Sequence, residues 1–328
     1  MLMKAAVLHK LKDIGCESVS MPKAENDEEI LKVAAAGICG SDVDRVYGKG
    51  AYHYPIILGH EFSGYRLRDG KKAVVFPLIP CMECAMCQTG EYAGCSDYDY
   101  YGSRRNGGFS EYIAVRKWNI IEAPNDADME ALAMTEPSAV ALHAISMLNI
   151  EPGQNVLITG AGPIGMLLGQ WARLSGAYKV YYIDMDRRKL DFAMNSGFHI
   201  HNSEPVDAAV EGTGASAPLA LCLESVRHKG TVVLMGNPAG DINLSQKEYW
   251  HILRKQLLLK GTWNSTFNSF RNEWHISVDA ITGGRLDVKP LISHKFTLDE
   301  CKAAFEILLE RNEFVNRVMF SIGREVAS

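Results

Sequence analysis

Short apolar runs, broken by glycine, proline and polar residues, make up most of the first 135 residues of the chain. This texture is typical of short strands joined by irregular connections. Residues 73–78 (A-V-V-F-P-L) and 111–115 are runs of this kind, and residues 68–71 (R-D-G-K) have the composition of a tight hairpin turn. The pattern predicts an irregular, β-rich domain at this end of the chain.

From about Glu136 the pattern changes. Segments with the hydrophobic spacing of helices alternate with short apolar runs typical of buried strands. We expect helices over residues 137–148, 164–175, 187–196, 218–228 and 247–255, and strands over residues 155–159, 179–184, 207–211, 231–235 and 257–262. Strands that alternate with helices predict βαβ units and a parallel sheet. Helices over residues 273–281 and 298–311 and a strand over residues 317–322 do not continue the alternation, so we expect them to return to the first domain.

The third strand of the expected parallel sheet is irregular. Residues 198–202 have strand character, yet only residues 203–206 separate them from the next strand. A parallel crossover ordinarily needs a dozen or more residues. Either this strand is vestigial or the usual crossover helix is missing. We therefore expect part of one sheet face to lie uncovered, unless a partner subunit covers it.

Length and composition exclude several classes of protein. At about 150 residues per domain, the 328 residues suggest two domains, and 47% hydrophobic residues are enough to bury a core. The net charge of −5, with both signs interspersed, argues against binding to nucleic acid or to a membrane surface. No apolar run reaches about 18 residues, and the start (M-L-M-K-A-A-V-L-H-K) lacks the apolar stretch of a secretory signal, so we expect a cytoplasmic protein.

A glycine-rich segment directly follows the strand expected over residues 155–159. Its members are Gly160, Ala161, Gly162, Pro163, Ile164 and Gly165. Three glycines at this spacing permit a tight turn, a close approach of the backbone to a pyrophosphate, and close helix–strand packing. The helix that begins here presents free N–H groups to phosphates. Because strand, glycines and helix occur in the required order, the segment predicts a dinucleotide-binding site.

Asp184 ends the next expected strand, nineteen residues beyond Gly165, where a carboxylate accepts hydrogen bonds from the ribose of a dinucleotide. A negative charge there favours NAD over NADP, because NADP carries a phosphate on that ribose. Arg187 and Arg188 follow closely and could bind such a phosphate, which leaves NADP as the alternative. We expect NAD as the cofactor, with Arg188 among the residues that contact it.

Four of the eight cysteines lie close together, at Cys81, Cys84, Cys87 and Cys95. In a reducing compartment such a cluster indicates a metal rather than disulfides. Four thiolates at this spacing can close a tetrahedron around Zn2+ with no open position, which is the arrangement of a structural site. The segment therefore predicts a structural zinc.

Three further segments carry side chains that bind metals or move protons: residues 39–42 (C-G-S-D), residues 59–61 (G-H-E) and residues 136–137 (E-P). Taken singly, a buried cysteine, a core histidine and a glutamate that starts a helix are ordinary features of a globular protein. No physical rule alone joins three such distant segments into one site.

The motifs G-I-C-G-S-D, L-G-H-E-F-S-G, the four-cysteine segment and G-A-G-P-I-G follow one another in the order typical of the zinc-dependent medium-chain dehydrogenase/reductase family. The resemblance covers essentially the whole chain. It implies an α/β fold with two domains: a GroES-like, β-rich catalytic domain over residues 1–139 and 266–328, and a Rossmann domain over residues 140–265 that binds NAD on a doubly wound parallel sheet. It also implies an oxidoreductase that forms a homo-oligomer, either a dimer or a tetramer.

Carried over by motif, the resemblance gives each scattered segment a role. Cys39, His60 and Glu136 are the expected ligands of a catalytic zinc, and Glu61 is expected near or on the metal. One sulfur, one nitrogen and one oxygen, with a fourth position open, suit a catalytic zinc. Ser41 is expected to hydrogen-bond the substrate hydroxyl and to pass its proton outward. Two zinc ions per chain, one catalytic and one structural, are therefore expected.

The chain departs from the family pattern in three places. Asp44 stands where many alcohol dehydrogenases have a relay histidine, five residues after the ligand cysteine. The strand–loop–strand between Gly64 and Ala73 is shortened to a hairpin, and the crossover helix of the parallel sheet is missing. The alternative from another class is a zinc-free or non-catalytic nucleotide-binding relative. Such relatives lack both zinc sites, whereas this chain has candidate ligands for both.

Within the family the chain resembles the polyol dehydrogenases. The segments Y-P-I-I-L-G-H-E-F-S-G-Y, P-L-I-P-C and G-S-R-R-N-G-G-F-S-E-Y are most similar to dehydrogenases of galactitol 1-phosphate. Arg104 and Arg105 are candidates to bind a substrate phosphate, because guanidinium groups bind phosphate bidentately. Trp263 and Asn264 follow the last strand of the sheet, where polyol dehydrogenases contact their substrate. A polyol phosphate is the expected substrate, and a free polyol or a smaller secondary alcohol is the alternative.

Overall fold

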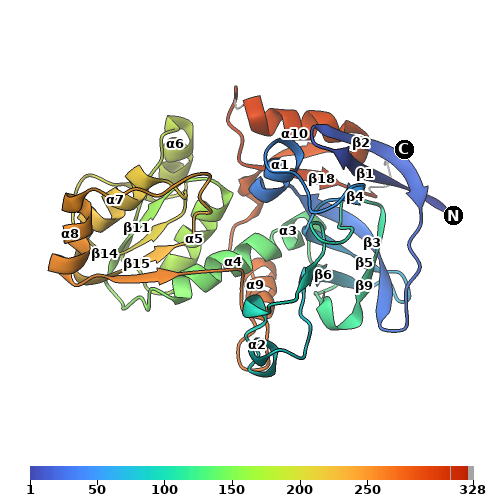
Figure 1. The fold of residues 1–328 in the computed structure, drawn as a ribbon, viewed down its shortest axis with the longest axis horizontal. Helices are drawn as coiled ribbons and strands as arrows, with labels where there is room; N and C mark the ends of the chain where they lie inside the picture. The colour runs from blue at the N-terminus through green and yellow to red at the C-terminus, as the bar shows by residue number, and fades with distance from the viewer. Residues whose placement is uncertain (311, 324–328) are drawn as a thin grey trace. The chain divides into compact units, whose positions relative to one another are not determined.

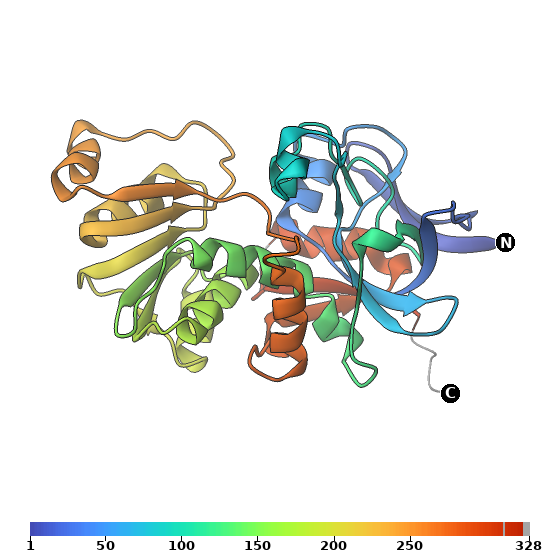
Figure 2. The same cartoon turned by 90° about the horizontal axis from the view of Figure 1, so that it is seen from below.

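The computed structural model describes residues 1–310 and 312–323 and divides into two compact units. Unit 1 comprises Met1–Glu136 and Thr266–Ser328, and unit 2 comprises Pro137–Ser265. In Figures 1 and 2 the C-terminal segments, drawn in orange to red, lie among N-terminal segments drawn in blue and cyan. Unit 1 is therefore built from both ends of the chain.

Unit 1 consists mainly of antiparallel strands. These are β1 (Leu2–Lys10), β2 (Asp13–Ser20), β3 (Glu28–Gly37), β4 (Ile56–Ile57), β5 (Glu61–Arg66), β6 (Lys72–Val75), β7 (Leu78–Ile79), β8 (Asp99–Tyr100), β9 (Tyr112–Arg116), β10 (Ile120–Glu122), β17 (Ile292–Phe296) and β18 (Arg317–Ser321). Seven of them form one sheet, in the order β10-β6-β5-β3-β18-β17 with β9 also paired to β3. The sheets β2-β1-β4 and β7-β8 are smaller.

The helices of unit 1 are short. They are α1 (Gly40–Tyr47), α2 (Ala85–Gln88), α3 (Met129–Leu132), α9 (Glu273–Thr282) and α10 (Cys301–Glu310), with 3-10 turns η1 (Tyr92–Gly94), η2 (Lys117–Asn119), η3 (Lys289–Leu291) and η4 (Leu298–Glu300). The helix predicted over residues 298–311 begins as η4 and continues as α10, and Arg311 lies outside the described residues. Among the described residues, no helix has the length and apolar character needed to cross a bilayer.

The core of unit 1 joins the two ends of the chain. The ring of Phe109 packs edge to face on Phe305 of α10 and on Phe320 of β18, with centroid distances of 6.1 and 4.9 Å. All three side chains are fully buried. Aromatic pairs in this geometry add to the free energy gained by burying their area. The C-terminal segment is therefore an integral part of the core of unit 1.

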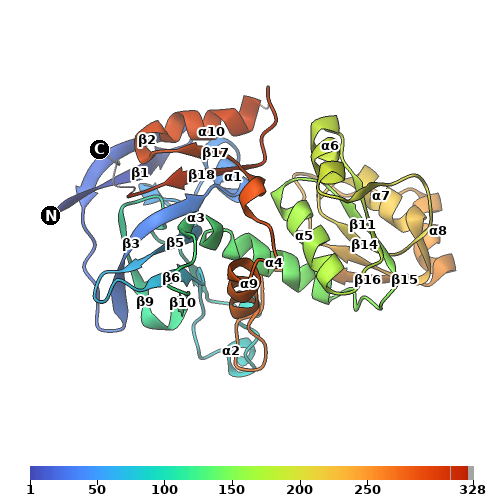
Figure 3. The same cartoon turned by 180° about the vertical axis from the view of Figure 1, so that it is seen from behind.

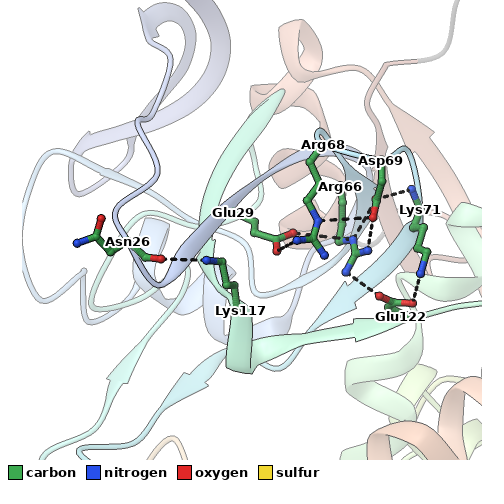
Figure 4. Close-up of polar contacts among 8 residues, drawn as sticks. All are labelled: Asn26, Glu29, Arg66, Arg68, Asp69, Lys71, Lys117 and Glu122. Atoms are coloured by element: carbon green, nitrogen blue, oxygen red, sulfur yellow. Dashed lines mark hydrogen bonds and ion pairs between the residues drawn. The ribbon is translucent and has the colours of Figure 1, made fainter.

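The shortened hairpin between β5 and β6 is held by one guanidinium group (Figure 4). The side chain of Arg66 is 7% exposed, its Nη1 lies 2.7 Å from Glu122 Oε1, and its Nε donates to Asp69 Oδ1 at 3.1 Å. The pKa of Asp69 falls to about 2, chiefly because Arg66 donates hydrogen bonds to this carboxylate. The predicted turn over residues 68–71 is confirmed, since β5 and β6 pair as antiparallel neighbours on either side of it.

Unit 2 contains one parallel sheet with helices on both faces (Figure 3). Its strands are β11 (Asn155–Thr159), β12 (Lys179–Ile183), β13 (His199–Ile200), β14 (Val206–Glu211), β15 (Val226–Leu234) and β16 (Leu258–Gly261). Its helices are α5 (Pro163–Leu174), α6 (Arg187–Asn195), α7 (Ser216–Ser225) and α8 (Gln246–Lys255), while α4 (Thr135–Ser146) runs from unit 1 into unit 2. The strand order β13-β12-β11-β14-β15-β16 is that of the Rossmann fold. The predicted fold class is confirmed.

One predicted helix is wrong at its end. The helix expected over residues 218–228 is α7, which ends at Ser225, and residues 226–228 begin β15 instead. Val226 is fully buried and pairs with Val206 of β14. A β-branched side chain that packs against a neighbouring strand favours the extended conformation, and this outweighs the helical pattern before it.

The connection from β13 to β14 crosses the sheet without a helix. Residues 201–205 join Ile200 to Val206, and β12 and β11 lie between the two strands that they connect. Three strand spacings amount to about 14 Å. The six Cα steps of this connection reach about 20 Å when extended. They can cross directly but leave no room for a helix, which advances about 1.5 Å per residue. The predicted absence of the crossover helix is confirmed.

The space of that helix is filled by a tyrosine. Tyr181 of β12 is 3% exposed, and its ring lies 5.7 and 5.9 Å from the rings of His199 and His201. Its hydroxyl donates to Glu204 Oε2 at 2.7 Å. The prediction of an uncovered sheet face is therefore wrong at this position, because a large ring and the short connection itself exclude water.

Replacing Tyr181 by Ala should destabilise unit 2 by about 3–5 kcal/mol, because a buried ring is lost and a cavity remains. Thermal or urea unfolding measures this loss. Tyr178→Ala is the matched control: Tyr178 is 71% exposed, and its loss should change stability by no more than about 0.5 kcal/mol. Equal effects of the two substitutions would contradict the account of the missing helix.

Candidate active site

The chain enters α1 immediately after Cys39. The backbone of Cys39 is extended, with φ −81° and ψ 154°, and its N–H donates to Asp42 Oδ2 at 3.1 Å. A carboxylate in the first turn that accepts from the residue before the helix stabilises the start of the helix. The hydrogen bond therefore holds the Cys39 thiol at a defined position on the first turn of α1.

His60 follows a position that requires glycine. Gly59 has φ +94°, and a Cβ atom there would lie 2.4 Å from the ring of Phe109. Only a residue without a side chain can pass the core so closely in this conformation. His60 and Glu61 come next, both buried, and Glu61 is the first residue of β5. The start of a core strand thus presents the imidazole and the carboxylate side by side.

Cys39, His60 and Glu61 form one group of metal-binding atoms. One such atom from each residue lies within 4.8 Å of the other two. Two ligands of one zinc, each about 2.0–2.3 Å from the ion, lie at most about 4.6 Å apart, so the group is close to the dimensions of a zinc site. Glu136, the third predicted ligand, lies outside this group, although it is buried and its pKa depends on the charge of His60.

A buried carboxylate lies beside the imidazole, and a buried guanidinium group lies beside the carboxylate of Glu61. Asp42, which is fully buried, has Oδ1 3.5 Å from His60 Nδ1. Arg317 of β18 has Nη1 2.7 Å from Glu61 Oε2, and the same nitrogen donates to the carbonyl of Ile38 at 2.8 Å. Carboxylates that bind the second nitrogen of a metal-binding histidine commonly fix its orientation. Each of the two buried metal-binding side chains, His60 and Glu61, therefore has a charged neighbour, Asp42 and Arg317 respectively.

Charged groups surround Cys39 and His60. The carboxylates are those of Asp42, Glu61 and Glu136, and the guanidinium groups are those of Arg45 and Arg317. Burial raises the pKa of Glu136 to about 7, so the ionised carboxylate is poorly stabilised by the protein alone. A bound cation would be the largest local charge and would reverse this effect. The donor set of one thiol, one imidazole and one carboxylate fits a zinc ion.

Ser41 lies beside an arginine. Arg45 Nη1 donates to Ser41 Oγ at 2.9 Å and lies 3.3 Å from Asp42 Oδ1. Asp44, at the position of the relay histidine, instead accepts a hydrogen bond of 3.4 Å from the N–H of Lys49 beyond the end of α1. Because a guanidinium group has no acceptor atom, a proton cannot pass from Ser41 to Arg45.

The four-cysteine segment forms a second group. One sulfur atom from each of Cys81, Cys84, Cys87 and Cys95 lies within 4.8 Å of the others, and none of the four is in a disulfide. The sulfur of Cys87 lies 3.8 Å from that of Cys81 and 3.5 Å from that of Cys84. A tetrahedron with zinc–sulfur bonds of about 2.3 Å has edges of about 3.8 Å, so the sulfurs already have the spacing of a closed zinc site.

The glycine loop of unit 2 has the geometry of a phosphate-binding turn. Gly160 has φ +90°, and a Cβ atom on Gly165 would lie 1.9 Å from the carbonyl oxygen of Gly160. Gly162 precedes α5, which begins at Pro163, so Ile164 is the second residue of the helix. The backbone N–H groups at the N-terminus of α5 therefore follow a glycine turn, which is the arrangement that binds phosphate groups.

Asp184 is joined directly to this loop. Its Oδ2 accepts from the N–H of Ala161 at 2.8 Å. Arg188, a predicted contact of the cofactor, pairs with Asp186 at 2.8 Å. Lys189 Nζ lies 3.8 Å from the Cβ position of Gly162, which places a cation beside the loop. Sequence reasoning missed Lys189, although its spacing from Asp184 on the next helix could have indicated it.

The two candidate phosphate-binding arginines have different surroundings. Arg105 donates to Asp99 at 2.6 Å and lies 3.6 Å from Glu28, so its charge is balanced within unit 1. It also lines a cavity of about 460 Å³ that contains none of the candidate zinc ligands. Arg104 is stacked between the rings of Tyr98 and Tyr52, with distances of 4.3 and 5.0 Å to their centroids. The two arginines therefore differ in their partners: Arg105 is paired with carboxylates, whereas Arg104 is stacked on aromatic rings.

Two family models match the chain: the alcohol dehydrogenase GroES-like domain over residues 25–125 and the zinc-binding dehydrogenase model over residues 163–281. Galactitol 1-phosphate 5-dehydrogenase of Escherichia coli K12 is 34% identical, over 92% of this chain and 95% of its own length. The chain belongs to the zinc-binding dehydrogenase family.

Two further relatives extend this result. Sorbitol dehydrogenase of Bacillus subtilis is 27% identical, over 97% of both chains. The crystal structure of galactitol-1-phosphate dehydrogenase from Escherichia coli superposes with a TM-score of 0.90 at 32% identity, covering 97% of this chain and 100% of the other. This zinc-binding dehydrogenase is an oxidoreductase that acts on alcohols, and zinc and NAD(P) are the cofactors of its family. The predicted family, enzyme class and cofactors are confirmed.

The remaining predicted substrate residues belong to unit 2. Trp263 is exposed and Asn264 has φ +60°, directly after β16 of this zinc-binding dehydrogenase. Arg317, which binds Glu61, was missed as a contributor to the site. Arg45 was considered only as a possible further contact of a substrate phosphate, and its hydrogen bond to Ser41 was not predicted. For Arg317 no spacing rule exists, because 256 residues separate it from Glu61.

Replacing Cys84 by Ser should remove about one zinc per chain and lower the melting temperature, because one of four sulfur ligands is lost. Elemental analysis and calorimetry measure both effects. Cys16→Ser is the matched control, since Cys16 belongs to neither cysteine-containing metal group. Unchanged zinc content and melting temperature in the Cys84 variant would contradict the structural zinc.

Proposed function

We propose that the chain oxidises a secondary hydroxyl group of a polyol phosphate similar to galactitol 1-phosphate and transfers the hydride to NAD. The observation that supports this reaction is the buried group of Cys39, His60 and Glu61, with the hydroxyl of Ser41 on the adjoining turn of α1. The glycine loop of unit 2 adds a site for the hydride acceptor. The two named relatives act on polyols or their phosphates, which supports the substrate class.

The residues of unit 1 would divide the chemistry among them. Zinc bound by Cys39, His60 and either Glu61 or Glu136 would supply a Lewis acid that favours ionisation of the substrate hydroxyl. Ser41 would orient that hydroxyl by a hydrogen bond. Because Arg45 already donates to Ser41 Oγ, one lone pair and the proton of Ser41 remain for the substrate side. That proton would leave by a path that does not include Arg45.

Support for NAD over NADP comes from the charges near the glycine loop. Asp184 accepts from the loop at Ala161, where its negative charge would repel a ribose phosphate. The two arginines that could bind such a phosphate are engaged elsewhere, since Arg187 pairs with Asp191 and Arg188 with Asp186, each at 2.8 Å. We therefore propose that Gly160, Gly162 and Gly165 bind the pyrophosphate and that Asp184 binds the ribose.

For the substrate phosphate, Arg104 is the stronger candidate of the pair. Its guanidinium stacks on Tyr98, whose ring lies 6.2 Å from that of Tyr100, and the Tyr100 ring lies 5.8 Å from the ring of His60. This row of rings links Arg104 to the candidate zinc ligands within unit 1. Arg104 Nη1 donates to the carbonyl of Tyr98 at 3.1 Å, and stacking on aromatic faces leaves the other N–H groups of the guanidinium for a phosphate.

The edge strand of unit 2 supports a homo-oligomer. β16 closes one side of the parallel sheet, and its side chains Leu258 and Leu259 are both exposed. On the adjoining helix α8, Tyr249, Trp250 and Leu253 are exposed as well. An exposed, apolar edge strand is a template for pairing with another chain. We propose that β16 pairs with the same strand of a second copy, which gives a twofold dimer.

Replacing Arg104 by Gln should raise KM for galactitol 1-phosphate about ten- to a hundredfold, because a charge-assisted hydrogen bond to the phosphate is lost. KM for unphosphorylated galactitol should be nearly unchanged. Steady-state rates of NAD reduction with the zinc-loaded enzyme measure both values.

Arg105→Gln is the matched control, because Arg105 is paired with Asp99 and Glu28. We expect this change to affect both substrates alike. If Arg104→Gln also affects both substrates alike, Arg104 is structural and the substrate is a free polyol. If the wild-type enzyme does not reduce NAD when it is given galactitol 1-phosphate or unphosphorylated galactitol, the proposed reaction is wrong.

A further inference from the structure

Arg45 is a charged residue that hydrogen-bonds Ser41 and that is not required as a metal ligand in any of the assignments above. Its side chain is 18% exposed, so most of the guanidinium is withdrawn from bulk water. Two of its N–H groups, both on Nη1, have partners at Ser41 Oγ and Asp42 Oδ1, at 2.9 and 3.3 Å. A guanidinium has five N–H donors. Three donors, on Nε and Nη2, therefore remain for other acceptors.

The position of these donors is defined by α1. Ser41 and Arg45 are four residues apart and share one face of the helix. Asp42 Oδ1 also lies 3.5 Å from His60 Nδ1, so a single carboxylate oxygen separates the guanidinium from the imidazole of a candidate zinc ligand. Because Arg45 Nη1 lies 2.9 Å from Ser41 Oγ, the other N–H groups of the same planar guanidinium lie within reach of a substrate that binds Ser41.

We propose that Arg45 is a specificity-determining residue that donates a hydrogen bond to an oxygen on the carbon next to the reacting carbinol. This inference rests on the proposed role of Ser41 in binding the reacting hydroxyl. The neighbouring oxygens of a vicinal diol are themselves about 3 Å apart, close to the length of a hydrogen bond. A diol can therefore satisfy Ser41 and Arg45 at the same time.

A substrate with an alkyl group in place of the neighbouring oxygen would fit Arg45 poorly. The guanidinium has no acceptor and stays charged, so an alkyl neighbour would leave its N–H groups without a partner in a site already withdrawn from water. Sites built to hydrogen-bond a substrate hydroxyl reject analogues that lack it strongly, for this reason. Arg45 thus selects polyols over simple secondary alcohols. This selection does not depend on a phosphate group at the far end of the substrate.

Butane-2,3-diol and butan-2-ol differ by the one oxygen concerned and are the probes for this test. We expect the zinc-loaded wild-type enzyme to prefer the diol, both in kcat/KM with NAD and in the dissociation constant measured by calorimetry with NADH bound. Arg45→Leu should lower this preference about ten- to a hundredfold. Arg45→Gln keeps an amide donor for Asp42 and Ser41 and should lower the preference for the diol less. This variant serves as the test if Arg45→Leu does not fold.

Arg116→Leu is the matched control, since Arg116 pairs with Asp27 at 3.5 Å and has no contact with α1 among its described partners. It should leave the preference unchanged. The inference is overturned if the wild-type enzyme binds neither probe, if it binds both equally, or if the Arg45 variants weaken both probes by the same factor. A diol preference in binding without any NAD reduction would instead contradict the proposed reaction and leave the role of Arg45 standing.

Discussion

The carboxylates of Asp42, Glu61 and Glu136 are withdrawn from water around one thiol and one imidazole, where an uncompensated charge costs roughly several kcal/mol. Two guanidinium groups offset part of this charge. Arg45 comes from the same helix as Asp42, whereas Arg317 comes from the C-terminal strand β18. Compensation of buried charge thus links the metal chemistry of unit 1 to its fold.

This requirement explains why the chain returns to unit 1 after the Rossmann unit. β18 pairs with β3 and brings Arg317 to Glu61, where one nitrogen binds both that carboxylate and the carbonyl of Ile38. Phe320, three residues later on the same strand, packs on Phe109 in the core. The C-terminal segment therefore supplies both a charge for the site and a ring for the core.

Features of the sequence that act over short distances were sufficient to predict much of the fold and part of the site. The spacing of the four cysteines places their sulfurs at zinc-binding distances, and the strand–glycine–helix order gives the loop at Gly160. The shortage of residues between Ile200 and Val206 directly predicted a sheet without a crossover helix. The sequence could not show that Tyr181 fills the space of the missing helix, because the size of a cavity depends on packing in three dimensions.

Contacts between distant segments could be predicted only by resemblance, or not at all. Cys39 and His60 were assigned to one site because known proteins carry the same motifs. That Glu61 rather than Glu136 lies in the group with them follows from the start of β5, and no pattern in the sequence indicates it. No pattern in the sequence indicates that Arg45 binds Ser41. Its hydrogen bond to Ser41 depends on the helical spacing of four residues together with the rotamers of both side chains.

The central claim is that unit 1 holds a catalytic metal at Cys39 that is separate from the structural metal of the four-cysteine group. The most direct test is the zinc content of Cys39→Ser, measured together with its turnover, its melting temperature and its affinity for NAD. The account predicts about two zinc ions per chain in the wild-type enzyme and about one in the variant, with turnover abolished and with stability and NAD affinity largely retained. A Cys39→Ser enzyme that keeps near-normal turnover, or a wild-type enzyme that binds no zinc at these residues, would contradict it.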